Sequence, residues 1–206
     1  MKKERTRSQI ARGARNKGNK AQREIAKLLG IWFFLDDDIF HSTPSSGGLR
    51  WKSKVGGTRG DIVTPDNIDW PFSIEIKNQE KSNWDLYSIL FNQGPIINDW
   101  WTQAEKDANE VNSQSTKYVL PWLIFKRNQV PFLMIMGETA FNNELLGIGR
   151  LNLPNNSFYI TNMGLYIMPL SAFLLSNKRH NIEDCLIQNS PLIKRHVINP
   201  SKGLSE

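Results

Sequence analysis

Residues 72–77 alternate strictly between apolar and polar side chains, and no other segment restricts the fold as much. In an extended chain Phe72, Ile74 and Ile76 lie on one face, whereas Ser73, Glu75 and Lys77 lie on the other. The alternation therefore predicts a strand with one buried face. Other apolar runs between turn residues predict strands at 38–41, 60–64, 118–125, 130–136, 158–160 and 165–168.

Amphipathic segments predict two main helices, and two weaker patterns predict short ones. The order helix, three strands, helix, two strands indicates an α/β domain with a mixed central β-sheet flanked by helices. We expect this domain to cover residues 18–177. The expected helices are 20–30, capped by Asn19 and closed by Gly30; 99–112, capped by Asn98; 138–146; and a last one capped by Ser171 and ending near 176.

Positive charge is concentrated at the beginning of the chain, although the whole chain carries only +6. Residues 1–30 contain ten Lys and Arg against two Glu, and the remainder is slightly acidic. We expect residues 1–17 to form a flexible basic arm. Neutralising phosphates releases condensed counterions, so such an arm favours nucleic-acid binding, although a solvated tail would look the same. The candidate DNA-binding residues here are Arg12, Arg15, Lys17 and Lys20.

A second basic segment, residues 43–59, is rich in Gly and Ser and predicts a loop. Its basic side chains could grip phosphates while Trp51 stacks on a base. A charged surface loop with Trp51 tucked into the core is an equal alternative. The candidate DNA-binding residues of this loop are Arg50, Lys52, Lys54 and Arg59.

Several classes of protein are disfavoured. The longest stretch without charge is broken by Asn, Ser, Thr and Pro, so no membrane span is expected. The single Cys185 cannot form an internal disulfide, and no Cys/His cluster suits zinc. We expect a soluble protein in the cytoplasm of a bacterium or a phage-infected host cell. Residues 178–206 are expected to form a C-terminal tail.

Asp61 and the triplet Glu75-Ile76-Lys77 are the candidate residues of a catalytic site. If strands 60–64 and 72–77 pair as a hairpin, Asp61 and Glu75 meet at one end, with Lys77 beside Glu75. Two carboxylates and the backbone carbonyl of Ile76 would form a hard oxygen site for Mg²⁺, or for Mn²⁺ in its place. A lysine there could orient and help deprotonate a water that attacks a phosphodiester. The alternative is a solvated face of an edge strand.

With these motifs the chain resembles the PD-(D/E)xK nuclease superfamily, and most closely the archaeal-type Holliday junction resolvases and their phage relatives. The resemblance covers roughly residues 15–136. The matching segments are Lys17–Glu24, Thr43–Gly48, Arg59–Val63, Ile74–Lys77 and Trp101–Ala104.

The resemblance implies a restriction-endonuclease-like core and extends the candidate site. It implies that Glu24 joins the metal ligands, that Ser46 contacts the scissile strand, and that Gln103 lies near the site. From the residues alone, Glu24 could instead pair with Lys20 or Lys27 on an exposed helix face. Gln103 could face solvent, and Ser46 could be an ordinary loop residue.

The sequence thus predicts a Mg²⁺-dependent endonuclease that cuts branched DNA, most plausibly a Holliday junction. Because a junction is two-fold symmetric and needs two cuts, a homodimer is expected. The alternatives are a restriction-type or repair endonuclease that acts on duplex DNA, and a DNA-binding protein without catalysis. We interpret Asp36–Asp38 as a turn and the pair Trp100-Trp101 as core.

Overall fold

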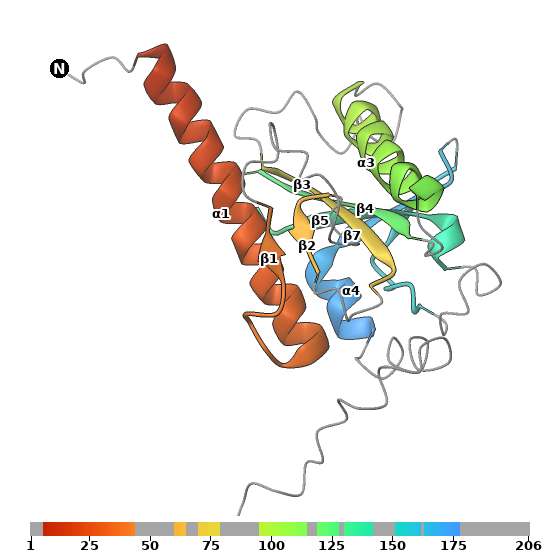
Figure 1. Ribbon diagram of the computed structural model, residues 1–206. Helices are drawn as coiled ribbons and strands as arrows, with labels where there is room; N and C mark the ends of the chain where they lie inside the picture. Colours follow the sequence, from red (N-terminus) through yellow and green to blue (C-terminus); the bar gives the residue numbers. More distant parts are fainter. Residues whose placement is uncertain are drawn as a thin grey trace, which may run out of the picture.

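The computed structural model describes most of the chain between Thr6 and Asn177 (Figure 1). Within the described residues, no helix is both long and apolar enough to cross a membrane. The candidate residues of the loop at 44–59 and the expected tail at 178–206 lie outside the described residues. The described ranges are 6–43, 60–64, 70–78, 95–114, 119–127, 130–141, 151–161 and 163–177.

The first helix, α1 (Arg7–Phe34), is much longer than the predicted helix at 20–30. The prediction of a flexible arm at 1–17 is therefore wrong from Arg7 onward. A capping box explains the early start, because the Thr6 hydroxyl accepts from the Gln9 N–H at 3.3 Å and the Gln9 side chain accepts from the Thr6 N–H at 3.0 Å. Asn19 accordingly lies inside the helix and does not cap it. Leu35, with a left-handed φ of 59°, ends it.

Gly30, the predicted end of this helix, lies within α1, which continues to Phe34. Its lack of a side chain matters for packing and does not end the helix. A Cβ at this position would collide with the backbone carbonyl of Asp36, which folds back over the last turn. The predicted turn at Asp36–Asp38 is confirmed, and the Asp38 N–H donates to the Asp36 carboxylate at 2.9 Å. Gly30 thus allows the close approach of a following turn.

The main sheet has five strands in the order β3-β4-β5-β7-β6. β3 and β4 are parallel and are connected through helix α3, whereas the other neighbouring pairs are antiparallel. This mixed sheet flanked by helices confirms the predicted fold class and is consistent with a restriction-endonuclease-like core. The bounds are β3 (Phe72–Asn78), α3 (Pro95–Gln114), β4 (Leu120–Lys126), β5 (Leu133–Gly137), β6 (Phe158–Ile160) and β7 (Leu165–Pro169).

The strand predicted at 38–41 is β1 (His41–Ser42), and three predicted helices also have other bounds. α3 begins at Pro95 and not after Asn98, since proline suits the first turn of a helix. The helix expected at 138–146 is a single 3-10 turn, η1 (Glu138–Ala140), within the described residues. The last helix, α4 (Leu170–Ser176), follows β7 directly, so Pro169 takes the cap position that was predicted for Ser171.

The hairpin predicted between 60–64 and 72–77 is wrong. β2 (Ile62–Val63) pairs antiparallel with β1 (His41–Ser42) in a separate two-stranded sheet. Gly60 forms a parallel bridge with Ile74, and the Asp61 N–H donates to the Ile74 carbonyl at 2.7 Å. The segment that carries Asp61 therefore runs alongside β3 in the same direction, at the edge of the main sheet.

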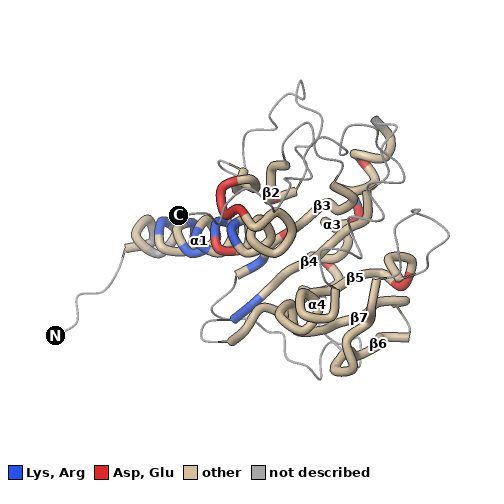
Figure 2. Tube along the Cα trace, turned by 90° about the horizontal axis from the view of Figure 1, so that it is seen from below, with Lys and Arg blue, Asp and Glu red and all other residues tan. Residues whose placement is uncertain are grey.

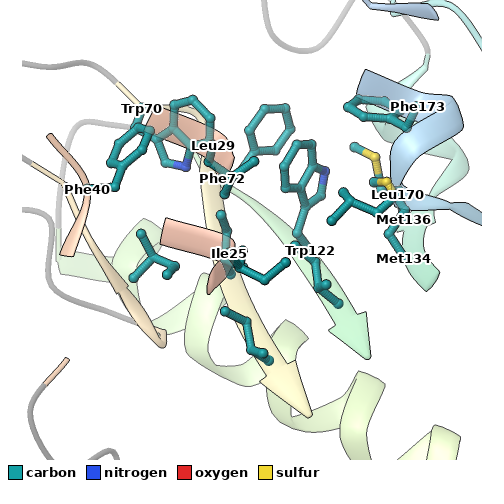
Figure 3. Close-up of a cluster of buried hydrophobic side chains, with 14 of the residues drawn as sticks. Ile25, Leu29, Phe40, Trp70, Phe72, Trp122, Met134, Met136, Leu170 and Phe173 are labelled. Atoms are coloured by element: carbon teal, nitrogen blue, oxygen red, sulfur yellow. The ribbon is translucent and has the colours of Figure 1, made fainter. Parts of the chain in front are cut away.

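The two faces of the sheet are covered by different helices. One hydrophobic cluster joins α1 and α4 to the face that carries Phe72, Ile74 and Trp122 (Figure 3). The Phe72 and Trp122 rings stack there, with centroids 4.2 Å apart. A second cluster joins α3, through the buried pair Trp100-Trp101, to the opposite face. The prediction that this tryptophan pair belongs to the core is confirmed.

Candidate active site

Asp61 makes four hydrogen bonds at the edge of β3, and one of them joins its carbonyl oxygen to the Thr43 N–H at 3.0 Å. Its N–H donates to the Ile74 carbonyl, and its Oδ2 accepts from the Ile76 N–H at 2.8 Å. Its Oδ1 accepts from Gln22 Nε2 of α1 at 2.6 Å. Asp61 is only 3% exposed, so these bonds replace those that water would have made.

The glycine that precedes Asp61 permits this close approach. Gly60 has a φ of +95°, a backbone conformation that residues with a Cβ rarely adopt. A Cβ there would lie 2.5 Å from the Ile74 carbonyl oxygen and 3.0 Å from the Ile74 nitrogen. The Gly-Asp dipeptide thus places the Asp61 carboxylate directly against the β3 backbone.

Glu75 and Lys77 lie on the α3 face of β3, two residues apart, as the alternation predicted. Lys77 Nζ is 2.5 Å from Glu75 Oε1 and donates to Gln103 Oε1 of α3 at 2.9 Å. Glu75 is 6% exposed, whereas the Lys77 side chain is 21% exposed. The structure thus brings Asp61, Glu75, Lys77 and Gln103 into one place, with the two carboxylates buried, Lys77 partly exposed and Gln103 exposed.

Burial makes both carboxylates hard to ionise. Desolvation raises the pKa of Glu75 to about 7, helped by repulsion from Asp61 and opposed by Lys77. Desolvation also raises the pKa of Asp61, although the hydrogen bonds from Ile76 and Gln22 oppose it. Asp107, one turn after Gln103 on α3, adds to the negative potential at both groups and was not anticipated from the sequence.

The donor set fits a hard divalent cation. Two adjacent carboxylates repel each other, and a cation between them would relieve that repulsion. The N–H and C=O of one residue in a strand point to the same edge, so the Ile76 carbonyl faces the edge where Asp61 accepts from the Ile76 N–H. Asp61, Glu75 and the Ile76 carbonyl would then hold the ion. Among the described residues, no group of three or more His, Cys, Asp or Glu is assembled as a metal site.

Glu24 does not join this group as the resemblance implied. Its carboxylate accepts from Lys126 Nζ of β4 at 3.0 Å and is half exposed. The α1 residue that contacts Asp61 is Gln22. Residues that are two positions apart in a helix are separated by about 200° around its axis. Gln22 and Glu24 therefore point to opposite sides of α1. Lys126, not Lys20 or Lys27, is therefore the partner of Glu24.

Gln22 was missed, although the sequence held a signal for it. The buried positions of α1 are 21, 22, 25, 26, 29, 30 and 33, which form a single stripe along the helix. Gln22 is the one polar side chain in that stripe. A polar residue on an otherwise apolar helical face needs a buried hydrogen-bond partner, and this requirement could have identified it.

The basic residues of α1 extend away from the sheet. The first half of the helix projects beyond the body, and Lys and Arg recur along it (Figures 1 and 2). Arg12, Arg15 and Lys20 are exposed and Lys17 is half-buried. Contact of α1 with the hydrophobic core begins at Ala21. The projecting half is therefore a positively charged helical surface.

The mixed sheet with an edge Asp and a Glu-x-Lys strand places this chain in the PD-(D/E)xK class. Residues 13–182 match the family described as "Phage putative PDDEXK endonuclease", and the chain belongs to that family. This confirms the superfamily to which the motifs pointed and makes the chain a member of a phage endonuclease family. No curated protein and no solved structure shows a matching similarity.

Proposed function

We propose that this protein is a Mg²⁺-dependent DNA endonuclease that hydrolyses phosphodiester bonds and prefers branched DNA, most specifically a Holliday junction. The observation that carries the nuclease activity is the convergence of two buried carboxylates, Asp61 and Glu75, on Lys77 at a sheet edge. Burial raises the pKa of both carboxylates, and such raised pKa values are common at functional sites.

Each residue of the site has a role in this proposal. A divalent cation held by Asp61, Glu75 and the Ile76 carbonyl would lower the pKa of the attacking water and offset the charge that develops on the phosphate. Lys77, which is partly exposed beside the two buried carboxylates, donates to that water or to a phosphate oxygen and so positions the reactants. Gln103 fixes the Lys77 ammonium between α3 and β3.

The DNA-binding surface in this proposal is the projecting half of α1, with Arg12, Arg15, Lys17 and Lys20. One acidic residue, Glu24, accompanies the seven Lys and Arg of α1, so the helix favours a polyanion. Arg50, Lys52, Lys54 and Arg59 would add contacts from the basic segment at 43–59, where Ser46 would touch the scissile strand.

The preference for junctions rests on the likeness of Lys17–Glu24 and of the segment at 43–48 to the junction resolvases. A junction presents two equivalent strands for cutting, so the proposed working unit is a homodimer with two active sites. Since Glu24 pairs with Lys126 and not with Asp61, the part of the likeness that concerns this glutamate does not support a role in metal binding.

The test is a cleavage assay on a labelled four-way junction, its linear duplex arms and the separate strands. Each substrate is incubated with Mg²⁺, Mn²⁺ or EDTA. Glu75→Gln is the site variant, and Glu105→Gln, the same chemical change at an exposed position of α3, is the matched control. We expect paired symmetric nicks in the junction alone, which disappear in EDTA and in Glu75→Gln but persist in Glu105→Gln.

Other results decide between the alternatives. Equal cutting of duplex and junction would keep the nuclease and discard the junction preference, as expected of a restriction-type or repair enzyme. Tight binding without cutting under either metal would show a non-catalytic DNA-binding protein. Sedimentation with and without the junction measures whether the active unit is a dimer.

A further inference from the structure

Asp61 has a neutral hydrogen-bond partner on α1, the side-chain amide of Gln22. Gln22 Nε2 donates to Asp61 Oδ1 at 2.6 Å, while the Ile76 N–H donates to the other oxygen at 2.8 Å. Gln22 is 5% exposed and Asp61 is 3% exposed. The two donors come from different elements, one from a helix and one from the strand edge, and together they fix the plane of the carboxylate.

The position of Gln22 in the fold makes this contact rigid. The buried stripe of α1 continues from Gln22 to Ile25 and Leu29. Ile25 and Leu29 belong to the core cluster that packs against the sheet (Figure 3). The backbone at Gln22 is therefore anchored by packing one turn further along the same helix face. A donor on such a support holds its acceptor more firmly than one on a loop.

The chemistry of the amide also matters. A Lys or Arg at this place would neutralise Asp61 and compete with a cation for it. A glutamine donates a hydrogen bond without adding a positive charge that would compete with a cation for Asp61. The positive side chain of the site, Lys77, is instead directed to Glu75 and Gln103.

We propose that Gln22 is a positioning residue that orients the Asp61 carboxylate for a divalent cation, so that cation affinity and turnover depend on its side-chain amide. This inference rests on the proposed function, because it assumes that Asp61 holds the ion. The partners that orient ligands in metal sites commonly change metal affinity by about 10- to 100-fold when they are removed, and we expect a loss in that range.

The test measures Mn²⁺ binding to the full-length protein without DNA, by electron paramagnetic resonance. Gln22→Met keeps the length and helix preference of the side chain but removes the donor. Gln22→Asn keeps the amide one methylene shorter and serves if the methionine variant is too unstable to use. Ile25→Val, on the same stripe, is the control for loss of packing without loss of the donor.

We expect both Gln22 variants to bind Mn²⁺ about 10- to 100-fold more weakly and to cleave with a lower kcat. Their DNA affinity in EDTA should stay within about 2-fold of wild type. Ile25→Val should lower the unfolding temperature but leave the Mn²⁺ affinity unchanged. Gln22 variants that are less stable yet bind Mn²⁺ like wild type would overturn the inference. A wild-type protein that binds no Mn²⁺ and cuts no DNA would overturn the proposed function itself, and this inference with it.

Discussion

Replacing Gly60 with alanine tests how the chain brings Asp61 to the strand edge. Gly60 has φ +95°, and an L-residue in the left-handed region is destabilised by about 1–2 kcal/mol. Its Cβ would also lie 2.5 Å from the Ile74 carbonyl oxygen, a backbone atom that cannot rotate away. The chain must then move, and the hydrogen bond from Asp61 to Ile74 would be lost, at about 0.5–1.5 kcal/mol. Together these two effects predict a destabilisation of about 1.5–3.5 kcal/mol.

Two other glycines separate these contributions. Gly164 also has a positive φ, +63°, but its added Cβ would meet nothing within 4 Å. Gly164→Ala should therefore show only the backbone strain, about 1–2 kcal/mol. Gly18 lies inside α1 with open space around it, so Gly18→Ala should be neutral or stabilise by up to about 1 kcal/mol. Urea unfolding followed by circular dichroism gives all three free energies.

The larger effect should appear in cleavage. A shift of about 1 Å in a catalytic group can lower the rate about 100-fold, so Gly60→Ala should lose at least that much activity under conditions where it remains folded. Gly164→Ala should cut at nearly the wild-type rate. If Gly60→Ala equals Gly164→Ala in both stability and cleavage, the close approach to Ile74 does not position Asp61, and the reasoning is refuted.

Three further predictions concern charge. The pKa of Glu75 rises from 4.5 to about 7 on folding, so the ionised form is disfavoured and the wild type should lose up to about 3 kcal/mol of stability as the pH rises from about 4.5 to 7. Denaturation in EDTA should show that the free energy of unfolding of Glu75→Gln rises relative to that of wild type across this pH range. Parallel curves of stability against pH for the two proteins would contradict the prediction. Glu24→Gln, which breaks a half-exposed ion pair, should change stability by less than about 1 kcal/mol and leave Mn²⁺ affinity intact; a large loss of affinity would restore its role as a ligand. Replacing Arg12 and Arg15 together with alanine should lower the slope of log binding constant against log salt by about 2, and an unchanged slope would remove the projecting helix from DNA binding.

The parts of the fold that follow from local pattern were predictable. The alternation at 72–77 identified β3 and put Glu75 and Lys77 on one face, since strand periodicity allows no other arrangement. The amphipathic segment at 99–112 identified α3. Both elements needed only the period of the hydrophobic residues, whereas the place of Gln103 near the site was implied by the resemblance and agrees with its hydrogen bond from Lys77.

The parts that depend on long-range pairing were not predictable in the same way. A run such as 60–64 shows an extended chain but not its partner or direction, and so the expected hairpin is replaced by a parallel bridge to Ile74. The length of α1 was underestimated for a local reason. Thr6-Arg7-Ser8-Gln9 is a capping-box sequence that marks the helix start in spite of the surrounding charge.

Within the site, the resemblance pointed to the carboxylate of Glu24, whereas the structure places the amide of Gln22 against Asp61. Glu24 is the more obvious metal ligand, but the stripe of buried residues in α1 includes Gln22 and leaves Glu24 on another flank. Geometry around the helix axis therefore decides which side chain reaches Asp61. Chemical type alone does not.

The most direct test of the account is single-turnover cleavage of a four-way junction in Mg²⁺ by wild type, Asp61→Asn and Glu75→Gln. The DNA affinity of each protein is measured in EDTA on the same preparation. The account predicts that wild type cuts, and that each variant binds the junction at least as tightly but cuts at least about 1,000-fold more slowly, consistent with the loss of several kcal/mol of transition-state stabilisation. Cleavage by either variant at the wild-type rate would contradict the claim that these two buried carboxylates form the catalytic centre.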